Sequence, residues 1–339
     1  MRKRWSLSLP MVGAPLSDLA EVSRAAEELG YTDAWSSEVD GIDAFTPLCV
    51  IAQATQMRLG TAIVNAYTRG PQTLASCVAG IAELAPGRFE LGIGSGSQPI
   101  IERWNGIPFA QPVTRVRELI EFLRLALTGE RVVYEGETIK VKGFRLSAPP
   151  EKPVGLHIAA LRPGMLRAAG RVADGVILNW LSAEDVKKSV AVVRQAAVEA
   201  GRDPDSIEVT ARLIVNLDPI GPESDELLRR SVTTYLNVPV YRHFHEWLGR
   251  TEQLGPMWGA WEAGDRGAAL AAVPSTLLDE LMVRGDPDRR NQQVRAYMEA
   301  GIDTAFLSFG TSEPDPMKRR ALVRQALRDM SPKAVGVHA

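Results

Sequence analysis

The sequence predicts a closed (β/α)8 barrel, an α/β fold in which eight parallel strands alternate with helices. Three observations lead to this fold. Short apolar segments alternate with longer amphipathic segments along the chain, as they do in proteins with a parallel sheet. The apolar segments are nearly continuous, as expected for strands buried on both faces. Eight such units within 339 residues fit one barrel better than two open sheets.

The predicted strands are short segments rich in apolar residues. In chain order they are residues 5–10, 32–37, 57–66, 87–94, 154–160, 174–179, 207–217 and 303–309. The amphipathic segments between the strands predict helices. These are residues 16–30, 43–55, 71–85, 114–130, 163–173, 182–201 and 315–330. The first helix has Leu19, Val22, Ala26 and Leu29 at helical spacing, and Gly30 is its stop signal.

Two segments depart from this rhythm. Residues 130–147 alternate Val and Ile with polar residues around the turn glycine Gly136, which predicts a β-hairpin. Residues 221–290 follow the seventh strand and are helical and rich in tryptophan, which predicts a helical insertion. Because no Pro- or Ser-rich linker marks a boundary, we expect a single domain spanning residues 1–339.

The composition excludes several classes of protein. It is that of a globular protein, with 45% hydrophobic and 24% charged residues. A net charge of -2 gives no reason to expect nucleic acid or a membrane surface as a partner. The two cysteines, Cys49 and Cys77, form no metal-ligand spacing, so neither a zinc site nor a disulfide framework is expected.

The start of the chain does not read as a targeting segment. It is basic, but Pro10, Gly13 and Pro15 interrupt the run that follows, whereas a signal peptide needs an apolar core. No stretch reaches the roughly 20 apolar residues that a membrane helix requires. We therefore expect a cytoplasmic protein with a small-molecule substrate.

The glycine-rich stretch LGIGSGSQPIIERWNG, residues 91–106, allows two interpretations. A dinucleotide-binding loop needs G-x-G-x-x-G running straight into a helix. Here the pattern is G-x-G-x-G-S, it lies on the fourth strand, and the next helix is expected only near Thr114. We therefore interpret Gly92 and Gly94 as barrel-strand residues, and the tail IERWNG as a loop over the barrel mouth.

The active site of such a barrel lies at the C-terminal ends of its strands. In this chain those ends are rich in small and amide side chains, and they contain neither a metal-ligand cluster nor a Ser-His-Asp set. His243 and His245 are two residues apart, which does not place them on one helix face for a metal. A mouth of this kind suits a planar cofactor that carries its own chemistry.

Several strand ends carry candidate residues, each with a plainer alternative. Glu38 either hydrogen-bonds near a ring as an acid–base group or caps the following helix. Asn65 and Ala66 either form a kink beneath a ring or belong to an ordinary loop. Asn179 either holds a phosphate or ring carbonyl or caps its strand. Trp258, with Trp247 and Trp261, either lines a pocket or belongs to a core.

A phosphate site is predicted after the fifth strand. Ala159, Ala160 and Leu161 precede a helix that opens with Pro163. Free backbone N–H groups at such a helix start bind anions, and proline is tolerated there because it lacks an N–H.

At this point the chain resembles a known family, the luciferase-like flavin and deazaflavin oxidoreductases, and within it the subgroup that uses coenzyme F420. Five segments carry the resemblance in order. They are AWSSEVDGIDAFTPL, RLGTAIVNAYTRGPQTLA, GRFELGIGSGSQPIIERWNGIPF, GLHIAALRPGMLRAAGRVADGVILNW and GDPDRRNQQVRAYMEAGIDTAFLSF. The resemblance extends from about residue 5 to residue 330 and implies a barrel with an insertion after the seventh strand.

The resemblance also implies how the cofactor is held. A deazaflavin or flavin lies across the mouth, and a non-proline cis peptide bond near Asn65–Ala66 supports its ring. The residues implied to contact the cofactor are Ser8, Glu38, Asn65, Ala66, Ser95, Gly96, Ala159, Ala160, Leu161 and Asn179. Many relatives have a histidine after the acidic residue that matches Glu38, but Val39 takes its place here. An imidazole proton donor is therefore not expected, and Glu38 is the candidate catalytic residue.

The resulting expectation is hydride transfer between deazaflavin C5 and a small, apolar or aromatic substrate. Two alternatives stay open, which are an FMN-dependent monooxygenase and a flavin- or F420-binding protein without catalysis. A homodimer is expected by resemblance. The substrate and the direction of the reaction do not follow from the sequence.

Overall fold

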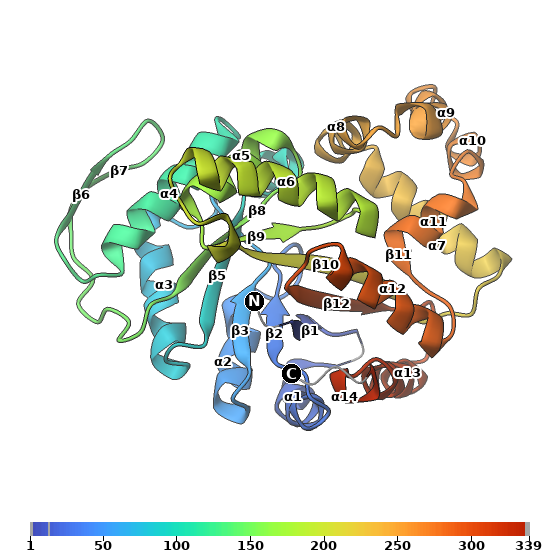
Figure 1. The fold of residues 1–339 in the computed structure, drawn as a ribbon, viewed down its shortest axis with the longest axis horizontal. Helices are drawn as coiled ribbons and strands as arrows, with labels where there is room; N and C mark the ends of the chain where they lie inside the picture. Colours follow the sequence, from blue (N-terminus) through green and yellow to red (C-terminus); the bar gives the residue numbers. More distant parts are fainter. Residues whose placement is uncertain (1–2, 13, 336–339) are drawn as a thin grey trace.

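The computed structural model describes residues 3–12 and 14–335 as a parallel barrel surrounded by helices (Figure 1). Residues 1–2, Gly13 and 336–339, which belong to the predicted domain, lie outside the described residues. The barrel strands are β1 (Arg4–Leu9), β2 (Asp33–Ser36), β3 (Arg58–Thr61), β5 (Phe89–Gly94), β8 (Gly155–Ala159), β9 (Gly175–Leu178), β10 (Glu208–Asn216) and β12 (Thr304–Gly310). They pair in this order, and β12 pairs with β1 to close the ring. The predicted (β/α)8 barrel is confirmed.

Helices cover the outside of the barrel. They are α1 (Leu19–Glu28), α2 (Phe45–Ala54), α3 (Pro71–Leu84), α4 (Pro112–Ala126), α5 (Pro163–Val172), α6 (Ala183–Glu199), α12 (Pro287–Glu299) and α13 (Pro316–Asp329), with the short α14 (Pro332–Val335) at the end. Proline lies in the first turn of several of these helices, where its missing N–H costs no hydrogen bond. The start of α6 is fixed by a capping box between Ser182 and Asp185.

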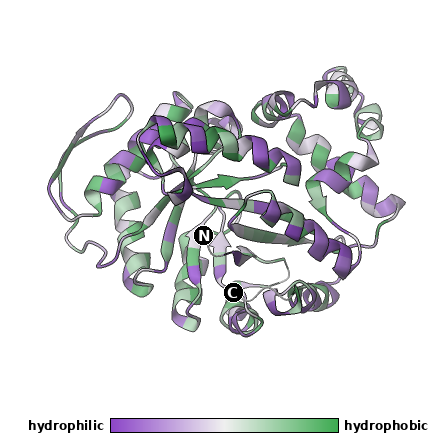
Figure 2. Ribbon diagram, viewed as in Figure 1, coloured by the Kyte–Doolittle hydropathy of each residue, from purple (hydrophilic) through white to green (hydrophobic). Residues whose placement is uncertain are grey.

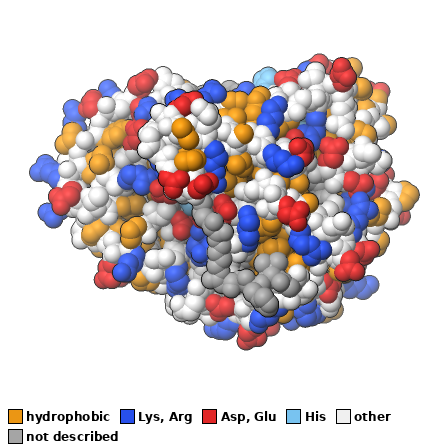
Figure 3. Space-filling model, in the orientation of Figure 1, with side chains coloured by type: hydrophobic (Ala, Val, Ile, Leu, Met, Phe, Trp, Pro, Cys, Tyr) orange, Lys and Arg blue, Asp and Glu red, His pale blue; other side chains and the backbone are white. Residues whose placement is uncertain are grey.

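The core lies between the barrel and these helices. In β1, Leu7 and Leu9 face outward into this core, while Ser6 and Ser8 face the barrel interior, because successive strand residues alternate in direction. Figure 2 shows hydrophobic strands in the middle and hydrophilic residues on the outer helices. Charged side chains of both signs are interspersed on the face seen in Figure 3. In the described ranges, no helix is both long and apolar enough to cross a membrane.

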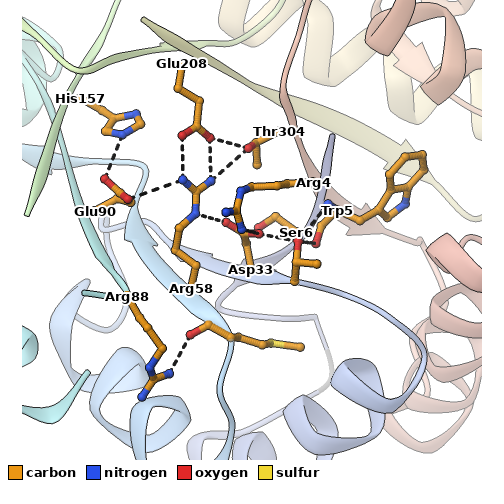
Figure 4. Close-up of polar contacts among 12 residues, drawn as sticks. Arg4, Trp5, Ser6, Asp33, Arg58, Arg88, Glu90, His157, Glu208 and Thr304 are labelled. Atoms are coloured by element: carbon orange, nitrogen blue, oxygen red, sulfur yellow. Dashed lines mark hydrogen bonds and ion pairs between the residues drawn. The ribbon is translucent and has the colours of Figure 1, made fainter. Parts of the chain in front are cut away.

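A network of charged side chains closes the N-terminal end of the barrel interior (Figure 4). Arg58 of β3 pairs with Asp33 of β2 and Glu208 of β10, and its Nη2 lies 2.6 Å from Glu208 Oε1. Glu90 of β5 lies 3.5 Å from Arg58 Nη1 and 3.2 Å from His157 Nε2. Burial opposes the charge on Glu208, but hydrogen bonds from Arg58 lower the pKa of Glu208 to about 2. We assign this end of the barrel to stability.

Two additions interrupt the barrel rhythm. An antiparallel hairpin of β6 (Val132–Glu135) and β7 (Lys140–Phe144) extends at the left of Figure 1. The insertion after β10 consists of α7 (Pro222–Leu236), α8 (Pro239–Leu248), α9 (Thr251–Glu262), α10 (Arg266–Ala271) and α11 (Ser275–Leu281), at the right of Figure 1. The strand β11 (Met282–Val283) returns to pair with β10. The insertion therefore ends before residue 290, and α12 is an ordinary barrel helix.

The prediction of a loop over the mouth is wrong for four of the six residues of IERWNG, residues 101–104. Residues Pro99–Trp104 form a short π-helix, η2, before α4 begins. Ile101 is fully buried in it, and the Ile107 N–H donates to the Ile101 carbonyl at 3.1 Å. The burial of this one side chain helps to order a segment that the sequence predicts as a loop. Proline in a first turn is compatible with a helix.

Candidate active site

The barrel interior is filled in its middle and open toward the C-terminal end. Trp35, Ile177 and Phe306 form a buried cluster inside the barrel. One step further toward the C-terminal ends, the inward-facing side chains are partly exposed, although their outward-facing neighbours are buried. This mouth layer consists of Ser8, Ala62, Ile63, Ala159, Asn179, Arg212, Ile214 and Ser308. Solvent therefore reaches a floor of mainly small side chains, where a (β/α)8 barrel places its active site.

Glycines make room for this floor. A Cβ on Gly92 would lie 1.9 Å from the Thr61 carbonyl oxygen, so the strand packing requires glycine there. A Cβ on Gly94 would lie 3.0 Å from Ile63 Cδ1 and 3.3 Å from Ala159 Cβ, at the floor itself. Both glycines belong to β5. Their role is close packing in the barrel, not a phosphate-binding turn.

The glycine that follows adopts a left-handed conformation. Gly96 has φ +67°, and a Cβ there would lie 2.2 Å from Asn65 Oδ1. Two predicted cofactor residues are thus neighbours at the strand ends. Ser95 beside them is half-buried, and its hydroxyl donates to the Gly96 carbonyl at 3.2 Å. Ser95, Gly96 and Asn65 form one side of the mouth.

The non-proline cis peptide bond lies between Ala62 and Ile63, three residues before the predicted position. It falls between β3 and the short strand β4 (Val64–Asn65), so the predicted strand 57–66 is interrupted there. Ala66 is fully buried in the outer core, and its N–H donates to the Gly94 carbonyl at 2.9 Å. Ala62 and Ile63, not Ala66, therefore face the mouth from this strand.

The start of α5 provides free backbone donors. The Ala160 N–H is already bonded to the Ile177 carbonyl at 3.0 Å. Within residues 3–12 and 14–335, the N–H groups of Leu161, Arg162 and Gly164 have no acceptor. The Arg162 side chain is exposed beside them. Of the three predicted phosphate residues, Leu161 offers a free donor, Ala160 does not, and Ala159 belongs to the mouth layer.

Glu38 is held in an ion pair. Its two carboxylate oxygens accept hydrogen bonds from Arg69 at 2.5 and 2.8 Å, and Oε2 also accepts from the Ala44 N–H at 3.2 Å. Hydrogen bonding to Glu38 raises the pKa of Arg69. The contact with Ala44 caps the start of α2, as the plainer interpretation expected, and Asp43 completes the cap through the Phe45 N–H at 2.8 Å. Arg69 was missed from the sequence, where it looks like an ordinary loop residue.

An aromatic wall rises beside the end of β9. Trp180 has φ +55°, and its backbone N–H donates a hydrogen bond to Asn179 Oδ1 at 2.9 Å. Its ring packs at 4.5 Å from Tyr235 of α7 and at 6.3 Å from Tyr241 of α8, measured between ring centroids. A non-glycine residue in this conformation is held there by its surroundings. The aromatic wall therefore consists of Trp180, Tyr235 and Tyr241.

The predicted tryptophans of the insertion do not form this wall. Trp258 is buried in the core of the insertion, and its Nε1 donates to the Leu236 carbonyl at 3.0 Å. Trp247 packs on Phe244, and Trp261 lies against Arg266. The wall tyrosines gave no sequence signal because their position depends on how α7 and α8 pack over β9.

Arg212 is the other residue that the sequence interpretation missed. It lies in the mouth layer on β10, and its Nη2 donates to Ser308 Oγ of β12 at 2.9 Å. A signal was present, because Arg212 interrupts the apolar segment TARLIVNL at a position that faces the barrel interior. The mouth thus combines a small-residue floor, a helix start with free donors, an aromatic wall and the Arg212 cation.

Comparisons with known proteins agree with this arrangement. The family model described as luciferase-like monooxygenase matches residues 5–304. The 5,10-methylenetetrahydromethanopterin reductase of Methanolobus tindarius is 28% identical over 295 residues, covering 85% of this chain and 89% of that protein.

Two solved structures share the fold. The coenzyme F420-dependent tetrahydromethanopterin reductase of Methanopyrus kandleri has a TM-score of 0.76 at 26% identity, covering 96% of this chain and 98% of that one. An F420-dependent secondary alcohol dehydrogenase in complex with an F420–acetone adduct has the same TM-score at 19% identity, covering 97% and 99%. At 19% identity, the comparison with the alcohol dehydrogenase shows a shared fold and nothing more.

Proposed function

The chain belongs to the luciferase-like monooxygenase family, and on that premise we propose that it is a coenzyme F420-dependent oxidoreductase that transfers a hydride between the deazaflavin and a small organic substrate. The observation that carries the proposal is the mouth layer, whose small side chains leave a partly exposed floor at the C-terminal end of the barrel. The Methanopyrus kandleri reductase described above, which is named for coenzyme F420, supports the choice of cofactor.

The residues present fit a flat ring with a phosphate-bearing tail. A Cβ at Gly94 would displace Ile63 or Ala159. Glycine at this position therefore keeps the floor low, and a flat ligand can lie close against it. The free N–H groups of Leu161 and Gly164 suit a phosphate at the start of α5. A single molecule with a ring and a phosphate would meet both features.

When bound, the deazaflavin supplies or accepts the hydride at its C5 atom. The chain's own residues orient and enclose it. Ala62 and Ile63, between β3 and β4, support the ring, and Asn65, Ser95 and Gly96 border it. Ser8 of β1 and Asn179 after β9 add polar groups on the two flanks of the floor. The aromatic wall of Trp180, Tyr235 and Tyr241 flanks the substrate side.

We assign Glu38 to positioning instead of proton transfer. Both its oxygens are engaged by Arg69, and one also caps α2 through Ala44. Charge-assisted hydrogen bonds of this kind hold a carboxylate firmly in one orientation. The pair instead fastens the loops that follow β2 and β4 to each other at the mouth. Any proton that the reaction needs would come from solvent or from the substrate.

The cofactor assignment is tested by titrating the purified protein with F420 and, separately, with FMN, and by following ligand fluorescence. We expect saturable binding of F420 and much weaker binding of FMN. Tight binding of FMN alone would overturn the assignment. Oxidation of reduced F420 with a panel of ketones, imines and enones then separates an enzyme from a protein that only binds the cofactor.

The homodimer also remains part of the proposal. Static light scattering of the full chain would test it, with a mass of twice 36.9 kDa expected. Cys49 and Cys77 are both free, in keeping with the reducing, cytoplasmic location that we propose.

A further inference from the structure

Arg212 is a cation without a protein counter-charge. Among the described residues, its only hydrogen-bond partner is the neutral hydroxyl of Ser308, and no carboxylate lies within ion-pair distance of it. Its Nε is buried and has no acceptor in the part of the chain that the structure describes. At the N-terminal end of the same barrel, Arg58 has three carboxylate partners, Asp33, Glu90 and Glu208. Burying a charge without a partner costs free energy, and an anion bound from outside the chain would offset that cost at Arg212.

The surroundings of Arg212 are rich in donors and poor in acceptors. Trp180 Nε1 is buried and has no acceptor among residues 3–12 and 14–335. Burial lowers the pKa of the Arg212 guanidinium, while Tyr235 and Tyr241 act in the opposite direction, so both tyrosines lie close enough to interact with its charge. A carboxylate only accepts hydrogen bonds, and its two oxygens match the planar fork of arginine.

The position of Arg212 separates it from the predicted phosphate site. The last paired residues of β9 and β10 are Leu178 and Ala211, so Arg212 lies beside Asn179. The free donors at the start of α5 follow β8 instead. The cation and the phosphate site therefore belong to different parts of the mouth, and Arg212 lies on the side of the aromatic wall.

We propose that Arg212 is a substrate-binding residue, and that the substrate is an organic acid whose carboxylate pairs with Arg212 while its apolar body packs on the aromatic wall of Trp180, Tyr235 and Tyr241. This inference rests on the proposed function, because it names the substrate class for that same mouth. It adds a charge requirement to the expected apolar or aromatic substrate. Arginine suits this role better than lysine, because its guanidinium binds a carboxylate through two parallel hydrogen bonds.

The test uses benzoate and benzamide, which share a flat apolar body and differ in charge. Their affinities are measured by isothermal titration calorimetry on the full chain, with and without F420. We expect benzoate to bind the unsubstituted protein more tightly than benzamide does. R212Q should weaken benzoate binding by about tenfold to a hundredfold, as expected for a charged hydrogen-bonded pair, and leave benzamide unchanged. R212K should retain part of the preference.

The control is R171Q, which removes the same charge from an exposed arginine on the outside of α5. It should leave both affinities unchanged. Equal binding of benzoate and benzamide, or equal benzoate binding by R212Q and the unsubstituted protein, would overturn the proposal. If R212Q does not fold, the benzoate–benzamide comparison and R212K still decide it.

The anion that pairs with Arg212 belongs either to the substrate or to the cofactor. Measuring F420 binding to the same variants distinguishes these two sources. Unchanged F420 affinity in R212Q assigns the anion to the substrate, as proposed. A loss of F420 affinity with no loss of benzoate affinity would assign Arg212 to the cofactor and overturn the proposal. Benzoate binding without any F420 binding would refute the proposed cofactor and leave the carboxylate site in place, so the two failures are distinguishable.

Discussion

His245 makes the stability of the protein fall as the pH drops below its ordinary titration range. It lies on α8 and is fully buried, and neither ring nitrogen has an acceptor or donor partner among the residues described. Burial lowers the pKa of His245 to about 4, the positive charge of Arg250 acts in the same direction, and Asp185 opposes both. In the unfolded chain the pKa of His245 returns to its ordinary value of 6.5.

The sign of the effect follows from proton uptake. Between pH 6.5 and about 4, the unfolded chain binds a proton at this histidine and the native protein does not, so the free energy of unfolding falls as the pH falls. The total loss is about 3 kcal/mol, and about 2 kcal/mol of it occurs between pH 6.5 and 4.5. Below the native pKa both states are protonated, and this contribution becomes constant.

Urea denaturation followed by circular dichroism at pH 6.5, 5.5 and 4.5 measures this loss. H245L should show a nearly flat stability over this range, whatever its absolute stability. H243L is the matched control, because His243 is exposed on the same helix, and it should keep the slope of the unsubstituted protein. An unchanged slope in H245L would refute the assignment of the pH dependence to this buried ring.

Three further changes test other parts of the structure. E38Q should lower the free energy of unfolding by about 1–2 kcal/mol, since it weakens a partly buried pair with Arg69, and a lost acidic limb in its pH–rate profile would contradict the positioning role. G94A should weaken F420 binding by about tenfold by narrowing the floor, while G80A, on an open helix surface, should leave binding intact and not destabilise the fold. As the pH falls from 4.5 to about 2, protonation of Glu208 lowers the free energy of unfolding of the unsubstituted protein by about 3 kcal/mol, because the pKa of Glu208 is depressed in the native state. E208Q should lack this pH-dependent loss, and an unchanged acid slope in E208Q would count against the ion network.

The barrel itself could be predicted because its signal is local and repeated. Each strand is an apolar run bounded by turn residues, and β9 and β10 are clear examples. The π-helix at Pro99–Trp104 was missed because its order depends on the burial of Ile101 against distant residues. The cis bond was misplaced by three residues because no residue type marks a non-proline cis peptide.

The site was predictable only where it follows the strand ends. Asn65 and Gly96 were expected at the mouth and do meet there. The Arg69 partner of Glu38 and the wall tyrosine Tyr241 come from a loop and an insertion helix, and their contacts arise from tertiary packing. Arg212 could have been recognised, because a charged side chain at an inward-facing position of a buried strand is rare and indicates a functional role.

The charged network around Arg58 gives the barrel a single entrance. With the N-terminal end closed by ion pairs and the middle filled by Trp35 and Phe306, a ligand can reach the floor only from the C-terminal side. Two ligands that occupy the mouth together must share this one opening. A substrate bound over the molecule that lies against Ile63 blocks its exit, so saturating substrate should slow the release of that molecule.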